Sequence, residues 1–490
     1  MALPNPAAGD RPGALEFASQ DRRHFDTTPW KSFGPRLGLA LSLTRKTILR
    51  TGYGLNFNNI YYDGFGGGLR HGFEATPSFT SPDGRQPAFF WDNGFPDNYK
   101  RPPFTDPSGQ NGFGIDYVSA DTRQPYIQSW NLGLQQQVTS DLTVEAFYVG
   151  TKGTRLARPL NLQQTRPEQL TLGDLLQKRI DDPAVVAAGF KSPYPAFIRD
   201  WGNGATLWRA LRPFPQFNSI NWINSQLGNS TYHSLQVKAE RRFAHGLQFL
   251  LAYTWSKNIT DAEAATRTGN GFRSYQNDWL GRKDKSLSGA DFPHVLGISF
   301  LYELPVGRDR RFRTSGAWDR LLGGWELTGT ARYLSGSPRS LSASCPSLSL
   351  TSAGGCRPSY TGVAELYGPG KRNIDPNDGQ PYFNADAFTV PAPYAFGDTP
   401  RVMGNLRWMP TLLESVGLLK RTRLDERFTL QIRAEAFNIF NRVMFNAPNA
   451  SIGSYDPRRP GNLNRNQNFG FFSGQSNDPR IVQVAMKLEF

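Results

Sequence analysis

The last ten residues of the chain, IVQVAMKLEF (481–490), alternate between apolar and other side chains. One set of alternating positions is entirely apolar and consists of Val482, Val484, Met486, Leu488 and Phe490. The positions between them include Gln483, Lys487 and Glu489. Strict alternation indicates a β-strand with one apolar face and one polar face. Chain ends are usually frayed and polar, so a strand that stops on a bare phenylalanine requires a particular environment.

The same alternation recurs through the chain. It is present in RLGLALSL (36–43), TILRTGYGLNF (47–57), YIQSWNLGLQQQVT (126–139), LTVEAFYVG (142–150), YHSLQVKAERRF (232–243), LQFLLAYTWS (247–256), HVLGISFLYEL (294–304), WELTGTARYL (325–334) and FTLQIRAEAFN (428–438), and less clearly in TLLESVGLLKR (411–421). With the final segment we expect about eleven strands of ~8–12 residues, the length that a tilted strand needs to cross a membrane.

The connections between these segments also alternate. Short turns such as TRK (44–46), SD (140–141), AHG (244–246) and DER (425–427) join the strands into hairpins, and long segments (58–125, 152–231, 257–293, 336–411 and 441–479) separate the hairpins. Outer-membrane barrels have short periplasmic turns and long extracellular loops. The predicted fold class is therefore all-β, an antiparallel transmembrane β-barrel, with its last strand running inward.

Composition leaves a soluble alternative open. Hydrophobic residues make up 38% of the chain, and no apolar run approaches the length of a membrane helix. A transmembrane barrel gives the same hydropathy, because its strands alternate. Alternating strands also build soluble sandwiches and propellers, but those folds have short loops. The long connections favour the membrane barrel.

Polar positions on the strands are candidates for the wall of a barrel lumen. Five such residues are Gln236, Lys238, Glu240, Arg433 and Glu435. Each lies between apolar positions of an alternating strand, so it is expected to point away from lipid. Arg433 and Glu435 share one face of their strand and can form a structural ion pair there.

We find no catalytic or metal-binding pattern, and we expect neither an enzyme nor a cofactor site. The five histidines lack zinc spacing, and neither a nucleophile elbow nor a phosphate loop occurs. The net charge of +14 is scattered without a dense basic run or a known nucleic-acid motif, which argues against nucleic acid as a partner.

Two cysteines, Cys345 and Cys356, lie close together in the segment SASCPSLSLTSAGGCRPS (342–359). Without a C-x-x-C pattern, this pair fits a local disulfide better than a metal site. The alternation of turns and loops places the segment outside the cell, where disulfides persist. We therefore predict a Cys345–Cys356 disulfide.

The long connections contain further signals. TRPEQLTLGDLLQKRI (165–180) has helical periodicity and a capping-box spacing between Thr165 and Glu168. Aromatic residues cluster in two connections, at Phe89, Phe90, Trp91, Phe95, Tyr99 and Phe104, and at Trp201, Trp208, Phe214, Phe217 and Trp222. Such clusters serve either as a ligand-binding rim or as small cores of the loops themselves, and the second interpretation is favoured.

Several segments together resemble a known family. QIRAEAFNIFNRVMFNAPN (431–449) closely resembles a signature of TonB-dependent receptors with a carboxypeptidase-regulatory-like domain, the Oar-like group common in Acidobacteria. FGPRLGLALSLTRKTILRTGYGLNFN (33–58), QSWNLGLQQQVTSDLTVEAFYVGTKGTRL (128–156) and YHSLQVKAERRFAHGLQFLLAYTWSKNITDA (232–262) resemble earlier strand pairs of the same barrel. The resemblance covers residues 30–490.

This resemblance implies a 22-stranded barrel, an internal plug, and energy drawn from the inner membrane through TonB. We interpret residues 36–490 as the C-terminal barrel region of such a receptor, and residues 1–35 as an irregular remnant of an upstream barrel segment in which only ALEFASQ (14–20) is a weak further strand. The expected location is the cell outer membrane. Expected partners are outer-membrane lipid, lipopolysaccharide, the barrel assembly machinery and, through a plug, the TonB system.

Three functions remain open from the sequence. The first is a receptor that imports a scarce, bulky ligand, whose identity no motif reveals. The second is a complete smaller porin or adhesin, and the third is a soluble carbohydrate-binding or hydrolytic protein. Because about eleven strands would leave unpaired edges, we predict an open half-barrel. The final strand (Val482, Val484, Met486, Leu488 and Phe490) resembles the C-terminal signal recognised by the assembly machinery, or alternatively Phe490 only anchors the strand in lipid.

Overall fold

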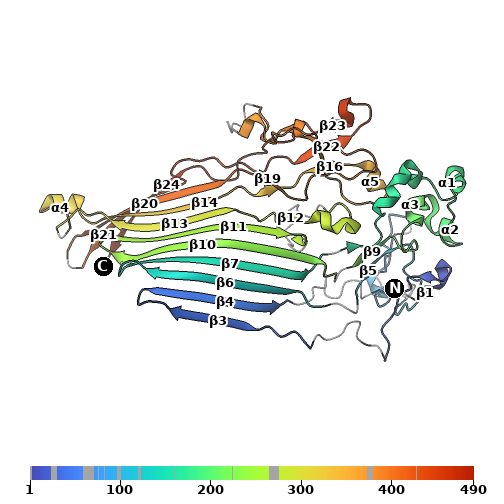
Figure 1. Cartoon of the computed structure of the whole chain (residues 1–490), viewed down its shortest axis with the longest axis horizontal. Helices are drawn as coiled ribbons and strands as arrows, with labels where there is room; N and C mark the ends of the chain where they lie inside the picture. The colour runs from blue at the N-terminus through green and yellow to red at the C-terminus, as the bar shows by residue number, and fades with distance from the viewer. Residues whose placement is uncertain are drawn as a thin grey trace.

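A computed structural model describes the chain except for residues 1–2, 22, 24–29, 59–70, 75–76, 82, 97–100, 120–122, 159, 223–224, 264–274, 309, 372–378 and 426. Its main feature is one large, curved antiparallel sheet (Figure 1). In chain order the strands are β3 (Arg36–Ser42), β4 (Thr47–Phe57), β6 (Tyr126–Gln137), β7 (Leu142–Leu156), β10 (Gly228–Ala244), β11 (Leu247–Thr260), β13 (His294–Glu303), β14 (Trp325–Leu334), β20 (Thr411–Arg423), β21 (Thr429–Phe437) and β24 (Ile481–Glu489).

Each of these strands pairs with the next one in the order just given, and every pairing is antiparallel. The eleven predicted strands are therefore confirmed in the described part of the chain. A short strand, β12 (Ser286–Leu287), pairs in addition with the end of β11. β7, β10 and β11 continue beyond the segments predicted from alternation, with β7 ending at Leu156, β10 beginning at Gly228 and β11 ending at Thr260.

The hairpin turns all lie at one end of the sheet. Between β10 and β11 the register pairs Ala244 with Leu247, so that only His245 and Gly246 form the loop. Both have positive φ, 51° and 78°, as a two-residue type I′ turn requires. The connection between β13 and β14 contains the short helix α4 (Ala317–Leu322), at the turn end of the sheet in Figure 1.

The sheet is open at both edges. In the described residues, β3 pairs only with β4 and β24 pairs only with β21. Both edge strands run from the loop end toward the turn end, so they are parallel to one another and cannot form a closing antiparallel ladder. The prediction of an open, curved half-barrel is confirmed. The weak strand expected at 14–20 is wrong, because those residues form no strand.

The register separates two faces of the sheet. Val482, Val484 and Met486 lie opposite Ala436, Ala434 and Ile432, so the apolar positions of neighbouring strands are on the same side. This side has no covering layer: Val484 is 73% exposed, Met486 75%, and Leu37 at the other edge 72%. A soluble protein does not expose apolar surface of this extent, whereas lipid covers it in a membrane.

The long connections form a layer of short elements beyond the other end of the sheet (Figure 1). The strands there are β1 (Pro4–Asn5), β2 (Arg11–Pro12), β5 (Gly114–Tyr117), β8 (Leu160–Asn161), β9 (Ser219–Trp222), β15 (Pro338–Arg339), β16 (Ser342–Ser344), β17 (Ser359–Tyr360), β18 (Phe388–Thr389), β19 (Met403–Arg407), β22 (Ser451–Tyr455) and β23 (Leu463–Arg465). The helices are α1 (Pro183–Ala187), α2 (Phe197–Trp201), α3 (Leu207–Ala210) and α5 (Pro346–Leu350). The 3-10 turns are η1 (Pro6–Ala8), η3 (Trp91–Asn93), η4 (Pro167–Gln177), η5 (Gly202–Gly204), η7 (Asp278–Asp284), η8 (Pro369–Lys371), η9 (Ala385–Ala387) and η10 (Pro460–Asn462).

This loop layer contains the buried apolar cores of the molecule. The largest core joins Phe383, Phe388 and Met403 from the connection that follows β14 to Ile452 and Phe469 from the connection that follows β21. Ala8 is buried in a second core with Phe197 and Leu207, so the N-terminal residues pack on the loop layer. The helix expected at 165–180 is instead the 3-10 turn η4, which is kinked at Gly173, where φ is 54°. At its start Gln169 Oε1 accepts a hydrogen bond from the backbone N–H of Arg166 at 3.0 Å. Among the described residues, no helix is both long and apolar enough to cross a bilayer.

Candidate functional site

The five candidate lumen residues lie on one face of the sheet. Glu240 is opposite Leu250, and successive pairings lead through Ser299, Thr330 and Ser415 to Phe437 on β21. Phe437, Glu435 and Arg433 alternate along β21 and so share that face, as Gln236, Lys238 and Glu240 do along β10. The alternation along β10 and β21, together with the strand register, therefore places all five residues on the same side of the sheet.

The charged residues on this face form ion pairs with neighbours on the same strand. Lys238 Nζ lies 2.6 Å from Glu240 Oε2, and Arg433 Nη1 lies 3.5 Å from Glu435 Oε1. Gln483 on β24 donates from Nε2 to Glu435 Oε2 at 2.5 Å. The candidates on β10 therefore pair among themselves, as do those on β21, although Glu240 and Glu435 line the same hollow.

That hollow lies along the curved sheet from β10 to β21 and has a volume of about 530 Å³. Its lining includes hydroxyl side chains of the lumen face, namely Ser299, Thr328, Thr330 and Ser415, together with Glu240, Gln248 and Glu435. Carboxylates and hydroxyls of this kind wet a surface and bind polar groups weakly, but without a base and a nucleophile in contact they provide no catalytic arrangement. Among the described residues, no group of three or more His, Cys, Asp or Glu side chains can hold a metal ion.

A buried ion cluster holds three of the long loops together. Asp284, from the loop between β11 and β13, accepts hydrogen bonds from Arg158 Nη2 at 2.9 Å and from Arg357 Nη2 at 2.7 Å. Arg158 follows β7, and Arg357 belongs to the loop between β14 and β20. Arg401 donates from Nε to the backbone oxygen of Asp284 at 2.9 Å and forms an ion pair with Glu263.

The cluster is almost completely removed from water. The side chains of Asp284, Arg357 and Arg401 are 1%, 2% and 0% exposed. Burial raises the pKa of Asp284, and the neighbouring Arg357 and Arg158 guanidinium groups oppose that shift. Burial also lowers the pKa of Arg357, against the attraction of Asp284. Pairing of every carboxylate with an arginine makes this burial tolerable, and the arrangement fixes the loops relative to one another.

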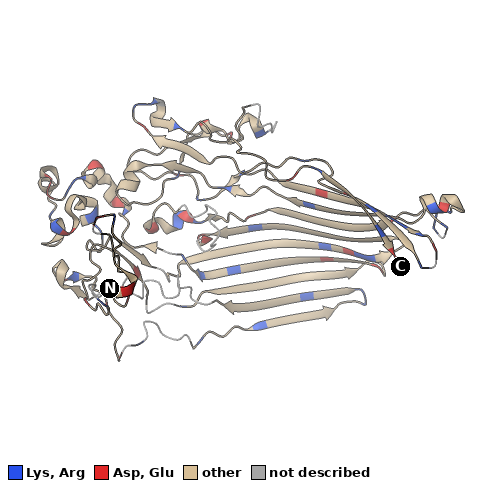
Figure 2. Cartoon of the chain, turned by 180° about the vertical axis from the view of Figure 1, so that it is seen from behind, with Lys and Arg blue, Asp and Glu red and all other residues tan. Residues whose placement is uncertain are grey.

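Sequence reasoning did not identify this cluster. Its members are isolated charged residues far apart in the chain, and no local pattern marks them. In Figure 2 the Lys and Arg positions and the Asp and Glu positions are likewise distributed over both strands and loops of the described chain.

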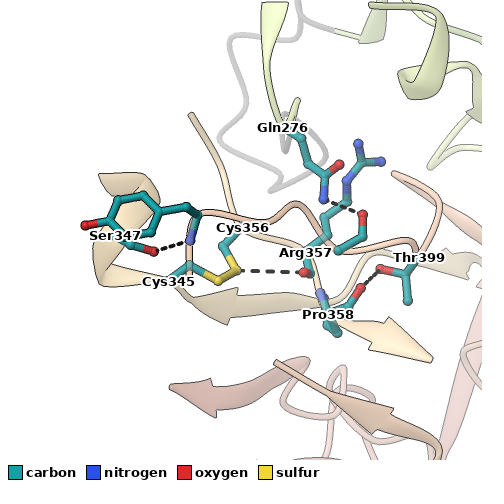
Figure 3. Close-up of a disulfide and its surroundings, with 9 residues drawn as sticks. Gln276, Cys345, Ser347, Cys356, Arg357, Pro358 and Thr399 are labelled. Carbon is teal, nitrogen blue, oxygen red and sulfur yellow. Dashed lines mark hydrogen bonds between the residues drawn. A yellow bond between two sulfur atoms is a disulfide. The ribbon is translucent and has the colours of Figure 1, made fainter. Parts of the chain in front are cut away.

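The disulfide lies beside this cluster. The structure joins Cys345 and Cys356, whose Cα atoms are 5.7 Å apart, within the loop layer. Both cysteines belong to a core with Leu176 and Leu348. Arg357 is the next residue in the chain, and Figure 3 shows it close to the disulfide, with Gln276 and Thr399 on neighbouring segments. The disulfide therefore restrains the backbone that carries one arginine of the ion cluster.

The two aromatic clusters differ in burial. Phe217 is 1% exposed in one core, and Trp201, Trp208 and Phe214 pack against the cores of the loop layer, as expected for loop cores. In the other cluster, Phe89, Trp91 and Phe95 contact one another with ring centroids 5.2–5.6 Å apart.

The cluster of Phe89, Trp91 and Phe95 nevertheless remains at the surface, since Trp91 is 75% exposed and Phe95 is 62% exposed. Phe79 also contacts Phe89 and Phe95. The rings therefore form a small cluster of their own, as favoured from the sequence, but one that leaves Trp91 and Phe95 largely exposed. Tyr99 lies outside the described residues.

The fold and its two faces define an outer-membrane β-barrel domain. The model of the family described as "Outer membrane beta barrel domain" matches residues 2–483, and the chain belongs to that family. The outer membrane is therefore its location, and the soluble all-β alternative is wrong. No curated protein matches the sequence.

Among solved structures, the chain is similar to outer-membrane import receptors. The ferric-catecholate receptor Fiu of Escherichia coli K12 is 11% identical with a TM-score of 0.36, and the alignment covers 93% of this chain and 34% of that one. The ferripyoverdine receptor of Pseudomonas aeruginosa is 10% identical with a TM-score of 0.36, covering 93% and 32%. The FrpB iron transporter of Neisseria meningitidis is 9% identical with a TM-score of 0.36, covering 93% and 39%. The chain spans about a third of the length of these proteins.

Proposed function

We propose that this chain is the C-terminal barrel region of a TonB-dependent receptor of the Oar-like type, which imports a scarce and bulky ligand through the outer membrane. In this proposal residues 36–490 belong to the barrel, and residues 1–35 are the remnant of an upstream barrel segment. TonB acts through a plug domain, and the barrel assembly machinery inserts the protein. The resemblance of several strand pairs to that group supports the assignment.

The observation that carries the proposal is the width of the open sheet. Eleven strands form a continuous path in the described residues, and its two edge strands run in the same direction. Antiparallel closure therefore needs an odd number of further strands between the edges. A barrel with many more than eight strands encloses a wide lumen rather than a packed interior, as passage of a bulky ligand requires.

The loop layer supports a receptor more than a simple pore. The buried ion cluster and the disulfide hold the loops in a defined arrangement at the outer end, which favours a preformed binding surface. The exposed rings of Trp91 and Phe95 are the candidate ligand contacts on that layer. Their chemistry suits ligands with apolar or aromatic parts.

The genomic DNA upstream of codon 1 tests the assignment. An in-frame segment encoding a signal peptide and a plug supports the receptor, and a stop codon with a promoter directly before Met1 contradicts it in favour of a smaller porin or adhesin. A second experiment separates the same alternatives. A complete porin gives stable single-channel currents in a planar bilayer, whereas a plugged receptor gives none.

A further inference from the structure

Two arginines, Arg209 and Arg212, lie next to one another on tryptophan rings in the loop layer. Arg209 belongs to α3 and Arg212 follows that helix, so that the backbone N–H of Arg212 donates to the Arg209 carbonyl at 3.3 Å. Their guanidinium carbons lie 5.0 and 4.2 Å from the centroid of the Trp208 ring. The Arg209 guanidinium carbon is also 3.7 Å from the centroid of the Trp201 ring. The two indoles therefore hold two positive charges close together.

Asn218 contacts both guanidinium groups. Its side-chain Oδ1 accepts a hydrogen bond from Arg209 Nη1 at 3.1 Å, and its backbone oxygen accepts one from Arg212 Nη1 at 2.7 Å. Arg209 Nε donates to the backbone oxygen of Gly204 at 3.0 Å. In the described part of the chain, the Nη2 group of each arginine has no acceptor, and the buried Nε of Arg212 has none either. Both guanidinium groups thus retain unused donors beside Asn218, which is an exposed residue.

No carboxylate forms an ion pair with either arginine among the described residues. Asp200, the carboxylate closest to them in the sequence, lies 2.9 Å from Arg199 instead. Asp181, earlier in the same connection, is paired with Arg179 at 2.7 Å. The acidic side chains of this connection are therefore engaged with other arginines, and the positive pair has no counterion from the chain.

Burial makes the missing counterion costly. The side chain of Arg212 is largely removed from water, with 4% of the residue exposed. This burial, with a smaller contribution from the positive charge of Arg209, lowers the pKa of Arg212 to about 9. Arg212 still carries its charge at neutral pH. A buried cation without a partner is unfavourable, whereas an oxyanion that accepts charge-assisted hydrogen bonds from both arginines compensates the charge.

A structural role in the following turn does not account for this arrangement. Arg212 Nη1 approaches the backbone oxygen of Phe217 at 3.5 Å, but fully buried Gln163 already holds that turn. Gln163 Nε2 donates to the backbone oxygens of Phe214 and Phe217, and its Oε1 accepts from the backbone N–H of Phe214 at 3.2 Å. Phe217 is also buried in an apolar core with Ile220. The turn therefore has its own restraints, and none of them requires two adjacent cations.

We propose that Arg209 and Arg212 form a binding site for a carboxylate group of a ligand that reaches the loop layer from outside the cell. The two oxygens of one carboxylate can accept hydrogen bonds from the unused Nη2 groups of the two arginines. Planar guanidinium groups suit this two-point contact, whereas a lysine ammonium group offers only a point charge. The site lies in the connection between β7 and β10, and it does not depend on the proposed import function.

The test measures how fast phenylglyoxal, which modifies arginine side chains, reacts with Arg209 in the 490-residue chain refolded in detergent micelles. Peptide mapping by mass spectrometry gives this rate and, in the same sample, the rate at Arg199, which is 79% exposed and pairs with Asp200. The probe is sodium acetate. The controls are acetamide, a neutral molecule of the same shape, and sodium chloride at equal ionic strength.

We expect acetate at about ten times its dissociation constant to slow the modification of Arg209 roughly tenfold, because only the unoccupied site reacts. The rate at Arg199 should not change, and neither acetamide nor chloride should protect Arg209. Absence of protection by acetate, or equal protection by acetamide or chloride, would overturn the proposal in the parent chain alone.

A pair of conservative variants tests the contribution of the second arginine. Arg212→Lys keeps the charge but removes the planar group, so most of the protection of Arg209 by acetate should be lost. Arg199→Lys is the matched control and should retain the protection. Limited proteolysis of the loops shows whether Arg212→Lys keeps the fold of the parent. Full protection in a folded Arg212→Lys variant would contradict a site made by both arginines.

Discussion

Asp284 and Arg357 form an ion pair in which Oδ1 and Nη2 lie 2.7 Å apart, and both side chains are almost fully buried. They come from two different extracellular connections, and the disulfide cysteine Cys356 directly precedes the arginine. The pair therefore couples the covalent restraint of one loop to the position of another.

Replacement of Asp284 by alanine should loosen the loop layer without unfolding the sheet. Loss of one partner leaves the buried arginines Arg158 and Arg357 uncompensated, which costs roughly 3–5 kcal/mol. Limited proteolysis should then cleave the long loops much faster than in the parent. Asp200→Ala is the control, because Asp200 pairs with Arg199, whose side chain is 79% exposed. Identical cleavage rates for Asp284→Ala and the control would contradict the role of the cluster.

Protein isolated from the outer membrane should contain no free thiol at Cys345 or Cys356. The two residues are separated by 11 positions, and closing a loop of this size restricts the unfolded chain by about 3 kcal/mol in the entropic model. Mass spectrometry after thiol labelling under denaturing conditions checks the prediction. Labelling of both cysteines before reduction would show that the bond does not form in the cell. The Cys345→Ser/Cys356→Ser variant should be cleaved faster in the segment between them.

The chain by itself should not give a protease-resistant monomer in the outer membrane. Within the described ranges, β3 and β24 each have one edge without a partner strand, whose backbone groups hydrocarbon cannot satisfy, and their common direction excludes an antiparallel seam between them. We expect aggregation or degradation in cells unless an odd number of further strands is supplied. Heat-modifiable monomers of the 490-residue chain alone on a gel would refute this. In detergent micelles water reaches the two edges, so refolding there remains feasible.

Deletion of Phe490 should strongly reduce the amount of folded protein in the outer membrane. Phe490 directly follows β24, continues the alternation of Val482 and Val484, and is 97% exposed. If the ring is part of an assembly signal, Phe490→Leu also reduces folded protein, whereas a simple lipid anchor tolerates leucine. The measurement is made on the complete barrel, with Phe440→Leu in a loop as the control. Unchanged assembly after deletion would show that the strand ends there for packing alone.

The strands could be predicted from sequence because each has one lipid-facing side, so that Val482, Val484 and Met486 display period-2 alternation without help from distant residues. The face shared by Glu240 and Glu435 followed from the same alternation. The loop layer could not be predicted in this way. Asp284, Arg357 and Arg401 meet only after long loops fold together. The 165–180 segment contains the 3-10 turn η4 in place of the expected helix, with a kink at Gly173, where φ is 54°. Whether a loop aromatic is buried depends on the same long-range packing. Phe217 is buried and Trp91 is exposed, although both belong to aromatic clusters in the sequence.

The most direct test of the account is whether the two faces of the sheet contact different media. Single spin labels or fluorophores are placed at Ile432, Arg433, Ala434 and Glu435 on β21, in a chain with Cys345 and Cys356 replaced by serine and refolded in micelles. Labels at Ile432 and Ala434 should be quenched by a detergent-attached quencher and protected from a water-soluble one, and labels at Arg433 and Glu435 should show the opposite pattern. Equal access of the water-soluble quencher to all four positions would contradict a membrane-spanning sheet with a lipid face and a lumen face.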